Sequence, residues 1–150
     1  MLRQRFTDEM KLAMKAGDRT RLDAIRLMIS DMKNKDVEAR TAGRTEASND
    51  DILAMLQKMI KQRQDSITMY DQGGRADLAD KEKSEIAVIT SFLPQQLSED
   101  DVRSAIAAAV AETGATSIKD MGKVVAVLKA KFSGQMDFGK ASGLVKAALG

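Results

Sequence analysis

The spacing of apolar residues limits what this chain can fold into more than any other feature of the sequence. Apolar side chains recur every three or four residues along the chain, as at Leu22, Ile25, Ile29 and Met32. No run alternates between apolar and polar residues as a half-buried β-strand does. The sequence therefore predicts an all-α protein.

Helix-starting and helix-stopping residues divide the first part of the chain into four predicted helices. Asp18 and Ser48 are suited to cap helix starts, and Gly17 and Gly73 to end helices. The expected ranges are about 2–16, from residue 18 to a loop at 39–48, from residue 48 to residue 73, and about 75–92. The inward face of the first helix is expected to comprise Leu2, Phe6, Met10, Ala13 and Met14. Leu27 lies nearly opposite the apolar stripe of the second helix, which indicates a helix surrounded by others.

The single proline, Pro94, marks an expected boundary between two parts of the chain. Proline disfavours helix in the preceding residue, so the fourth helix is expected to end by Leu93. Three short, Ala-rich helices follow, with expected starts near Ser98, Met121 and Asp137. We therefore expect a four-helix region over residues 1–93 and a three-helix domain over residues 94–150.

Composition excludes several classes of function. The chain has no His and no Cys, which rules out disulfides, thiolate nucleophiles, zinc fingers and imidazole bases. No metal site, cofactor or catalytic residue is predicted. No apolar run reaches the ~20 residues that a membrane span needs, and the first 16 residues resemble neither a signal nor a transit peptide. We expect a cytoplasmic protein that does not enter membranes.

Charged residues interrupt the apolar stripes of two predicted helices, and Arg26 borders the stripe of a third. Arg63 falls inside the stripe of the third helix, and Glu82 and Glu85 fall on the apolar face of the fourth. Because an isolated buried charge is costly, such residues are expected to pair with one another. The predicted network comprises Arg26, Arg63, Ser66, Tyr70, Glu82 and Glu85. A structural role is favoured over an acid–base or metal site, since no nucleophile or third ligand type lies nearby.

Lysine is concentrated near the carboxyl end. Residues 119–150 hold six Lys against two Asp, whereas residues 94–118 hold one Arg against four acidic residues. The six are Lys119, Lys123, Lys129, Lys131, Lys140 and Lys146. One interpretation is a solvated helix surface; the other is a surface that contacts RNA phosphates, with Lys119 and Lys123 one turn apart on one helix face.

Several motifs together resemble the YqeY family. They are RLDAIR at 21–26, KQRQDSI at 61–67, GRADLA at 74–79, Glu82 with Glu85, FLP at 92–94, AETGA at 111–115 and DMGKV at 120–124. The resemblance covers essentially the whole chain. Two positions differ from the usual pattern: Phe92 stands where the family usually has Tyr, and Gln135 where it often has a basic residue.

The resemblance implies a two-part helical protein whose carboxy-terminal part is similar to the tail domain of GatB. GatB is the tRNA-handling subunit of the glutamine-dependent aminoacyl-tRNA amidotransferase, and the family label is carbon–nitrogen ligase with glutamine as amido donor. The catalytic part of GatB and its amidase partner have no counterpart in this chain. We therefore expect a tRNA-associated accessory protein without a complete active site, which contacts tRNA or other structured RNA and an amidotransferase or related protein. The alternatives are a protein-interaction adaptor with no RNA role and an autonomous enzyme that uses the carboxylate network.

Overall fold

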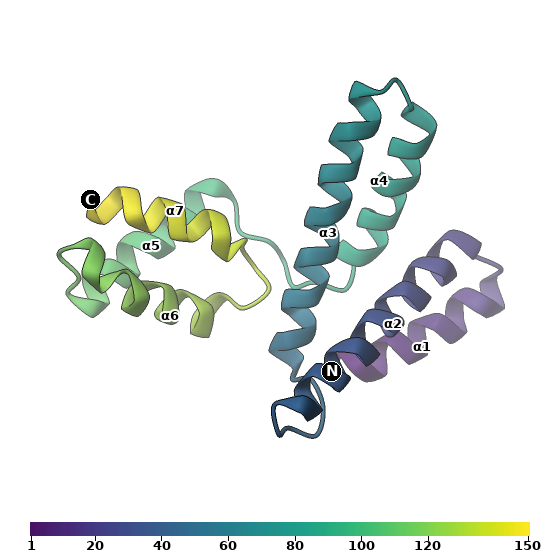
Figure 1. Cartoon of the computed structure of the whole chain (residues 1–150), viewed down its shortest axis with the longest axis horizontal. Coiled ribbons are helices and arrows are strands. Elements are labelled where there is room, and N and C mark those ends of the chain that lie inside the picture. Colours follow the sequence, from purple (N-terminus) through teal and green to yellow (C-terminus); the bar gives the residue numbers. More distant parts are fainter. The chain divides into compact units, whose positions relative to one another are not determined.

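A computed structural model describes all residues from 1 to 150 and contains helices but no strand (Figure 1). The prediction of an all-α protein is confirmed. The elements are α1 (Leu2–Ala16), α2 (Arg19–Thr41), α3 (Asn49–Gln72), α4 (Ala76–Thr90), α5 (Glu99–Thr113), the 3-10 helix η1 (Ile118–Asp120), α6 (Met121–Phe132) and α7 (Phe138–Leu149). None of the helices combines the length and the apolar character needed to cross a membrane.

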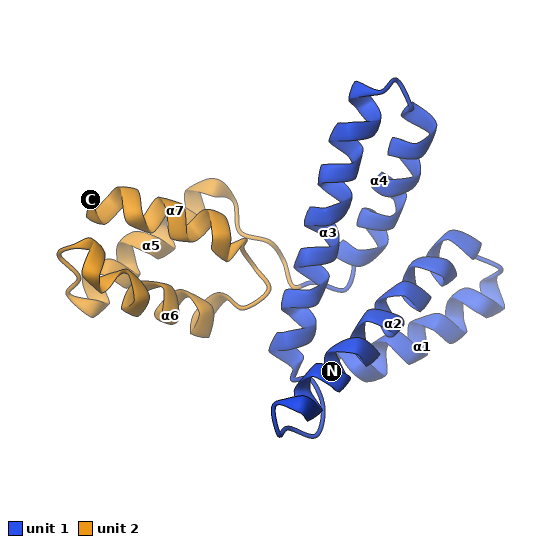
Figure 2. Cartoon of the chain, viewed as in Figure 1, with its two compact units in different colours: residues 1–93 blue, residues 94–150 orange.

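The helices gather into two compact units (Figure 2). The amino-terminal unit, Met1–Leu93, contains α1 to α4, and the carboxy-terminal unit, Pro94–Gly150, contains α5 to α7 and η1. Each unit has its own hydrophobic core, so neither depends on the other to bury its apolar side chains.

The amino-terminal unit is built from two helical hairpins, α1 with α2 and α3 with α4. Its core includes the fully buried side chains of Phe6, Ile25, Met28, Leu56 and Ile89. The start of α3 is fixed by a capping box: the Ser48 hydroxyl accepts a bond from the Asp51 backbone, and the Asp51 carboxylate accepts one from the Ser48 backbone. This local signal is why the helix begins where the sequence places it.

The carboxy-terminal unit packs three short helices around Val124, Leu128 and Val145, none of which is exposed. Helix α6 runs opposite to α5 and α7, so α5 and α7 run in the same direction (Figure 1). The segments before α5 and before α7 are joined, since the Leu97 backbone N–H donates to the Gln135 carbonyl at 2.9 Å. The amino-terminal ends of α5 and α7 therefore lie at the same end of the unit.

Two expectations about inward faces are wrong. Met14 is 54% exposed, because it is turned about 100° around α1 from the buried Ala13. Leu27 is 46% exposed, so the helices that pack on α2 leave that side uncovered. Helix α2 is thus not enclosed on all sides.

Candidate functional site

All six predicted RNA-binding lysines are exposed to solvent, and they are distributed over three elements. Lys119 lies in η1; Lys123, Lys129 and Lys131 lie on α6; Lys140 and Lys146 lie on α7. The expectation that Lys119 and Lys123 share one α-helix face is wrong, because α6 begins only at Met121, after the 3-10 turn that holds Lys119.

The lysines do not form a single stripe. Six residues correspond to about 600° of rotation in an α-helix, which puts Lys129 well away from Lys123, and Lys146 away from Lys140. Lys131 forms a 2.6 Å ion pair with Glu112, and Lys123 contributes to a lowered pKa of Asp120 whose largest cause is a backbone hydrogen bond from Thr116. Apart from Lys131, none of the six forms an ion pair, so five of them, Lys119, Lys123, Lys129, Lys140 and Lys146, stay available to a polyanion.

Arg63 joins α3 to α4 at the centre of the predicted polar network. Its Nε donates to Glu85 Oε2 at 2.8 Å and lies 3.9 Å from Glu82 Oε2, while Nη1 donates to the Met59 carbonyl at 3.1 Å. The side chains of Arg63, Glu85 and Glu82 are 15%, 16% and 21% exposed. The two carboxylates are thus held by a guanidinium, in a largely shielded place between two helices.

The other three predicted members do not join this network. Arg26 is exposed on α2, since its position at the edge of the apolar stripe lets the long side chain reach water, and its inclusion was wrong. The Ser66 hydroxyl donates to the Gln62 carbonyl of its own helix, and Tyr70 is half-buried without a side-chain hydrogen bond. No group of three acidic side chains is placed to hold a metal ion. The ion pairs of Arg63 with Glu82 and Glu85 therefore hold α3 against α4.

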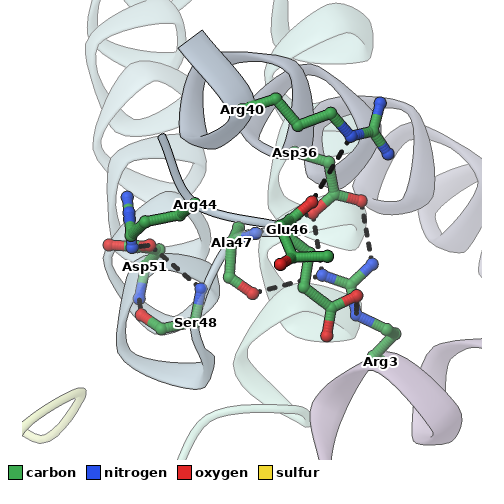
Figure 3. A network of polar contacts seen from close by, with 9 residues as sticks. Arg3, Asp36, Arg40, Arg44, Glu46, Ala47, Ser48 and Asp51 are labelled. Atoms are coloured by element: carbon green, nitrogen blue, oxygen red, sulfur yellow. Dashed lines mark hydrogen bonds and ion pairs between the residues drawn. The ribbon is translucent and has the colours of Figure 1, made fainter. Parts of the chain in front are cut away.

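A second ion pair, between Arg3 and Asp36, was not predicted from the sequence (Figure 3). Arg3 donates to both carboxylate oxygens of Asp36, at 2.9 and 2.8 Å, and also to the Ala47 carbonyl at 3.2 Å. The Ala47 backbone N–H donates to Asp36 at 2.9 Å. The hydrogen bonds from Arg3 lower the pKa of Asp36 to about 2, because they outweigh the burial that would raise it. Asp36 could have been recognised in the same way as Arg63, as a charged residue on an apolar helix stripe. It lies one turn beyond Met32 on the stripe of α2.

Two arginines enclose the Phe92 ring at the end of α4. The guanidinium carbons of Arg5 and Arg21 lie 4.9 and 5.3 Å from the centre of the ring, and the Phe6 ring meets it edge-on at 5.2 Å. Arg5 also donates to the Ser91 carbonyl at 2.7 Å. These contacts hold the carboxyl end of α4 against α1 and α2.

An open groove separates α5 from α7 in the carboxy-terminal unit. It consists of two adjoining hollows of about 570 and 460 Å³, and both are lined by Arg103 of α5 and Leu144 of α7. We refer to it as the α5–α7 groove. Helical periodicity gives the inward faces of α5 and α7 but not the space between their other sides, so the groove could not be predicted from the sequence.

Comparison with known proteins gives one match along nearly the whole chain and others along part of it. Residues 3–149 match the family model described as Yqey-like protein. Proteins named "Altered inheritance of mitochondria protein 41, mitochondrial" are similar over part of the chain. The one from Vanderwaltozyma polyspora is 36% identical over 85 residues, which is 57% of this chain and 44% of that protein. Those from Lachancea thermotolerans and Saccharomyces cerevisiae (strain ATCC 204508 / S288c) are 37% identical over 87 residues, 58% of this chain and 45% of each protein.

The matched part of this chain therefore spans less than half the length of these curated relatives, whose names assign them to mitochondria. The family model, by contrast, extends from residue 3 to residue 149 and includes every α-helix of both units apart from the first residue of α1. On that match, the chain belongs to the YqeY family.

Proposed function

We propose that this YqeY protein is a tRNA-associated accessory protein of the cytoplasm, whose carboxy-terminal unit contacts tRNA or other structured RNA. The observation that supports this most is the set of six exposed lysines in that unit, five of them without an ion pair. Lysines that neutralise phosphates release counterions from nucleic acid and so favour binding.

Binding is expected to be directed at phosphates and backbone shape, and not at bases. The carboxy-terminal unit has two aromatic residues, Phe132 and Phe138, and both are half-buried against its core. A stacking platform needs exposed rings, which these do not provide. Because the lysines are spread over η1, α6 and α7, the affinity is expected to be modest.

A complete active site is not part of the proposal. The carboxylates of Glu82 and Glu85 are engaged by Arg63. An accessory role implies a catalytic partner, and the resemblance to the GatB tail makes an amidotransferase or another aminoacyl-tRNA-handling protein the partner of choice. That resemblance remains a prediction from sequence motifs.

The test measures binding of a fluorescent tRNA pool to the full chain over a range of salt concentrations. The logarithm of affinity should fall linearly with the logarithm of salt, by roughly 0.7–0.9 per neutralised phosphate. Replacing Lys119 and Lys123 by Gln should weaken binding and flatten this slope without changing helix content. Replacing the exposed Lys11 and Lys15 of α1 by Gln removes the same charge from the other unit and should leave the slope unchanged.

Absence of binding to the tRNA pool at low salt would exclude the RNA role. Equal losses in the two double variants would show a non-specific charge effect and would equally contradict the proposal. If the Lys119 and Lys123 variant bound RNA as well as the unaltered chain, the contact would be made by other lysines of the unit.

A protein-interaction adaptor without an RNA role is the second candidate. The observation in its favour is the α5–α7 groove, an uncovered and largely apolar surface of the kind that receives a partner. An adaptor would retain its partner at high salt, whereas RNA would be released.

A further inference from the structure

The hydrophobic core of the amino-terminal unit covers only part of the length of α3 and α4. Its last buried member on α3 is Met59, and its first on α4 is Val88. Both helices extend well beyond these residues, and a turn at residues 73–75 joins their ends. We refer to residues 64–84 as the distal arm. Figure 1 shows the turn of this arm far from α1 and α2, so neither of these helices covers its tip.

The distal arm contains a single buried side chain, that of Ala79, which is 1% exposed. The apolar side chains of Ile67, Leu78 and Tyr70 are half-buried, and Met69 is 72% exposed. The free energy gained by burial grows with the apolar area removed from water. Hydrophobic burial therefore stabilises the arm much less than it stabilises the core.

Polar side chains do not join the two helices within the distal arm. Three hydroxyls donate to carbonyls four residues earlier in their own helix, at 3.1 or 3.2 Å; they belong to Ser66, Thr68 and Ser84. Bonds of this kind give no contact between helices and slightly weaken the helix that contains them. Two exposed ion pairs within the arm lie along α4 and its start, namely Arg75–Asp77 and Asp80–Lys83.

The strongest contact between α3 and α4 lies directly beyond the two ends of the arm. Arg63 Nε donates to Glu85 Oε2 at 2.8 Å, and the two side chains are 15% and 16% exposed. Arg63 Nη1 also donates to the carbonyl of Met59, the last core residue of α3, at 3.1 Å. Such charge-assisted hydrogen bonds are stronger than those between neutral groups. Packing between α3 and α4 thus weakens beyond Arg63.

We propose that the distal arm opens as one segment while the rest of the amino-terminal unit stays folded, and that the Arg63–Glu85 pair sets the limit of the opening. Each helical half of the arm has nine residues, fewer than the ~12–15 that an isolated helix needs. Regions with few buried apolar contacts open at a lower free energy than the core. Gly73 and Gly74 favour the open state, because glycine loses the most conformational freedom on folding.

The chain has no Cys, so a single introduced thiol can report this opening in the full chain. Ala79→Cys places the thiol in the arm and Ala24→Cys places it in the core on α2, at sites that are 1% and 3% exposed. Ala79→Cys should react with a thiol reagent at least about 100-fold faster than Ala24→Cys, because local opening requires less free energy than global unfolding. It should react more slowly than Ala76→Cys, at an exposed site of α4. Urea should accelerate Ala79→Cys less steeply, since less surface is exposed.

A core substitution separates local opening from global unfolding. Ile52 is 2% exposed and lies in the part of α3 that stays packed when the arm opens. Ile52→Val should therefore accelerate labelling of Ala24→Cys by about two- to tenfold, the usual effect of one deleted core methyl group. The same substitution should leave the labelling rate of Ala79→Cys unchanged.

The role of the Arg63–Glu85 pair is tested at Val88, three positions beyond Glu85 and 9% exposed. In the unaltered background Val88→Cys should react as slowly as Ala24→Cys. Arg63→Ala removes the limit, so the opening should extend toward the core and the ratio of the Val88→Cys rate to the Ala24→Cys rate should rise. An unchanged ratio would show that the pair does not limit the opening.

Several outcomes would overturn the local opening itself. They are equal labelling rates and urea dependences for Ala79→Cys and Ala24→Cys, equal acceleration of both by Ile52→Val, and reaction of Ala79→Cys as fast as that of Ala76→Cys. The last would show that the arm is not closed in solution.

Trypsin provides a second measurement on the chain without any introduced thiol, in case circular dichroism shows that Ala79→Cys disturbs the fold. Cleavage within a helix requires that the helix first open. Lys81 in the arm and Lys58 beside the core are both exposed and both lie within helices. Cleavage after Lys81 should precede cleavage after Lys58, and the reverse order would contradict the proposal.

Discussion

Arg3 and Asp36 lie 33 positions apart in the sequence, yet the guanidinium of Arg3 donates to both oxygens of Asp36, at 2.9 and 2.8 Å. Asp36 is the one charged residue in the buried class, with 7% exposure. The same carboxylate accepts the Ala47 N–H, so one ion pair connects α1, α2 and the segment that leads into α3. Charge-assisted, two-pronged contacts of this kind are among the strongest hydrogen bonds in proteins.

Arg3→Ala should lower the free energy of unfolding by about 1.5–3 kcal/mol, because it leaves the Asp36 charge buried without its main partner. Urea unfolding followed by circular dichroism measures this. Arg19→Ala is the matched control: Arg19 is 83% exposed and its 3.7 Å contact is with the exposed Asp23. The control should change stability by no more than about 0.5 kcal/mol. Equal losses in the two variants would contradict a special role for Arg3.

Stability should fall in acid, partly through Asp36. Its pKa in the folded protein is about 2, below the value near 3.9 of an unfolded chain. The folded state therefore gains from ionised Asp36 above about pH 5, and this gain, about 2 kcal/mol, is lost as the pH falls toward 2. Unfolding free energies measured between pH 5 and pH 2 should decrease less steeply in Asp36→Asn. Asp23→Asn, at an exposed site, should keep the original dependence.

Arg63→Ala should destabilise the amino-terminal unit by about 3–5 kcal/mol, because two largely shielded carboxylates lose their counter-charge. Adding Glu85→Gln should recover part of this loss, since the amide needs no counter-charge. A double-mutant cycle between the two positions isolates their coupling, expected within the 0.5–3 kcal/mol range of contacting residues. Additive losses would show that Arg63 and Glu85 do not act on each other.

Mild proteolysis with a protease of broad specificity should first cut between Pro94 and Asp101. Pro94, Gln95 and Gln96 are exposed and precede the first turn of α5, whereas the helices on either side are held by separate cores. Mass spectrometry of the early fragments identifies the site. A first cut inside α6 would contradict the presence of two independently packed units.

The helices were predictable because their signals are local. Ser48, Ser98 and Asp137 cap the helices that the sequence assigns to them, and Gly17 and Gly114 adopt the left-handed conformation that ends α1 and α5. The environment of Leu27 was not predictable in this way. Whether the second side of a helix is covered depends on where other helices pack, and helical periodicity does not contain that information.

The polar clusters were likewise predictable only where their signals are local. The pairing of Arg63 with Glu85 could be predicted because both charged residues lie on apolar helix faces. Including Arg26 in the network was wrong, because a long side chain at the edge of an apolar stripe can extend into solvent. The Arg3 contact depends on a loop that brings Ala47 back to α2, and no spacing rule gives that path. The α5–α7 groove likewise depends on the shared direction of two helices.

The hydrogen bond between the Ala47 amide and Asp36 has a consequence for hydrogen exchange. Ala47 lies outside any helix, yet it is 4% exposed and its N–H is held by a buried carboxylate. Loop amides normally exchange with solvent deuterium through small local openings. This amide is released only when α1 and α2 separate from the α3 entry, so it should exchange as slowly as the helical core. A single loop amide would thus report the global opening of the amino-terminal unit.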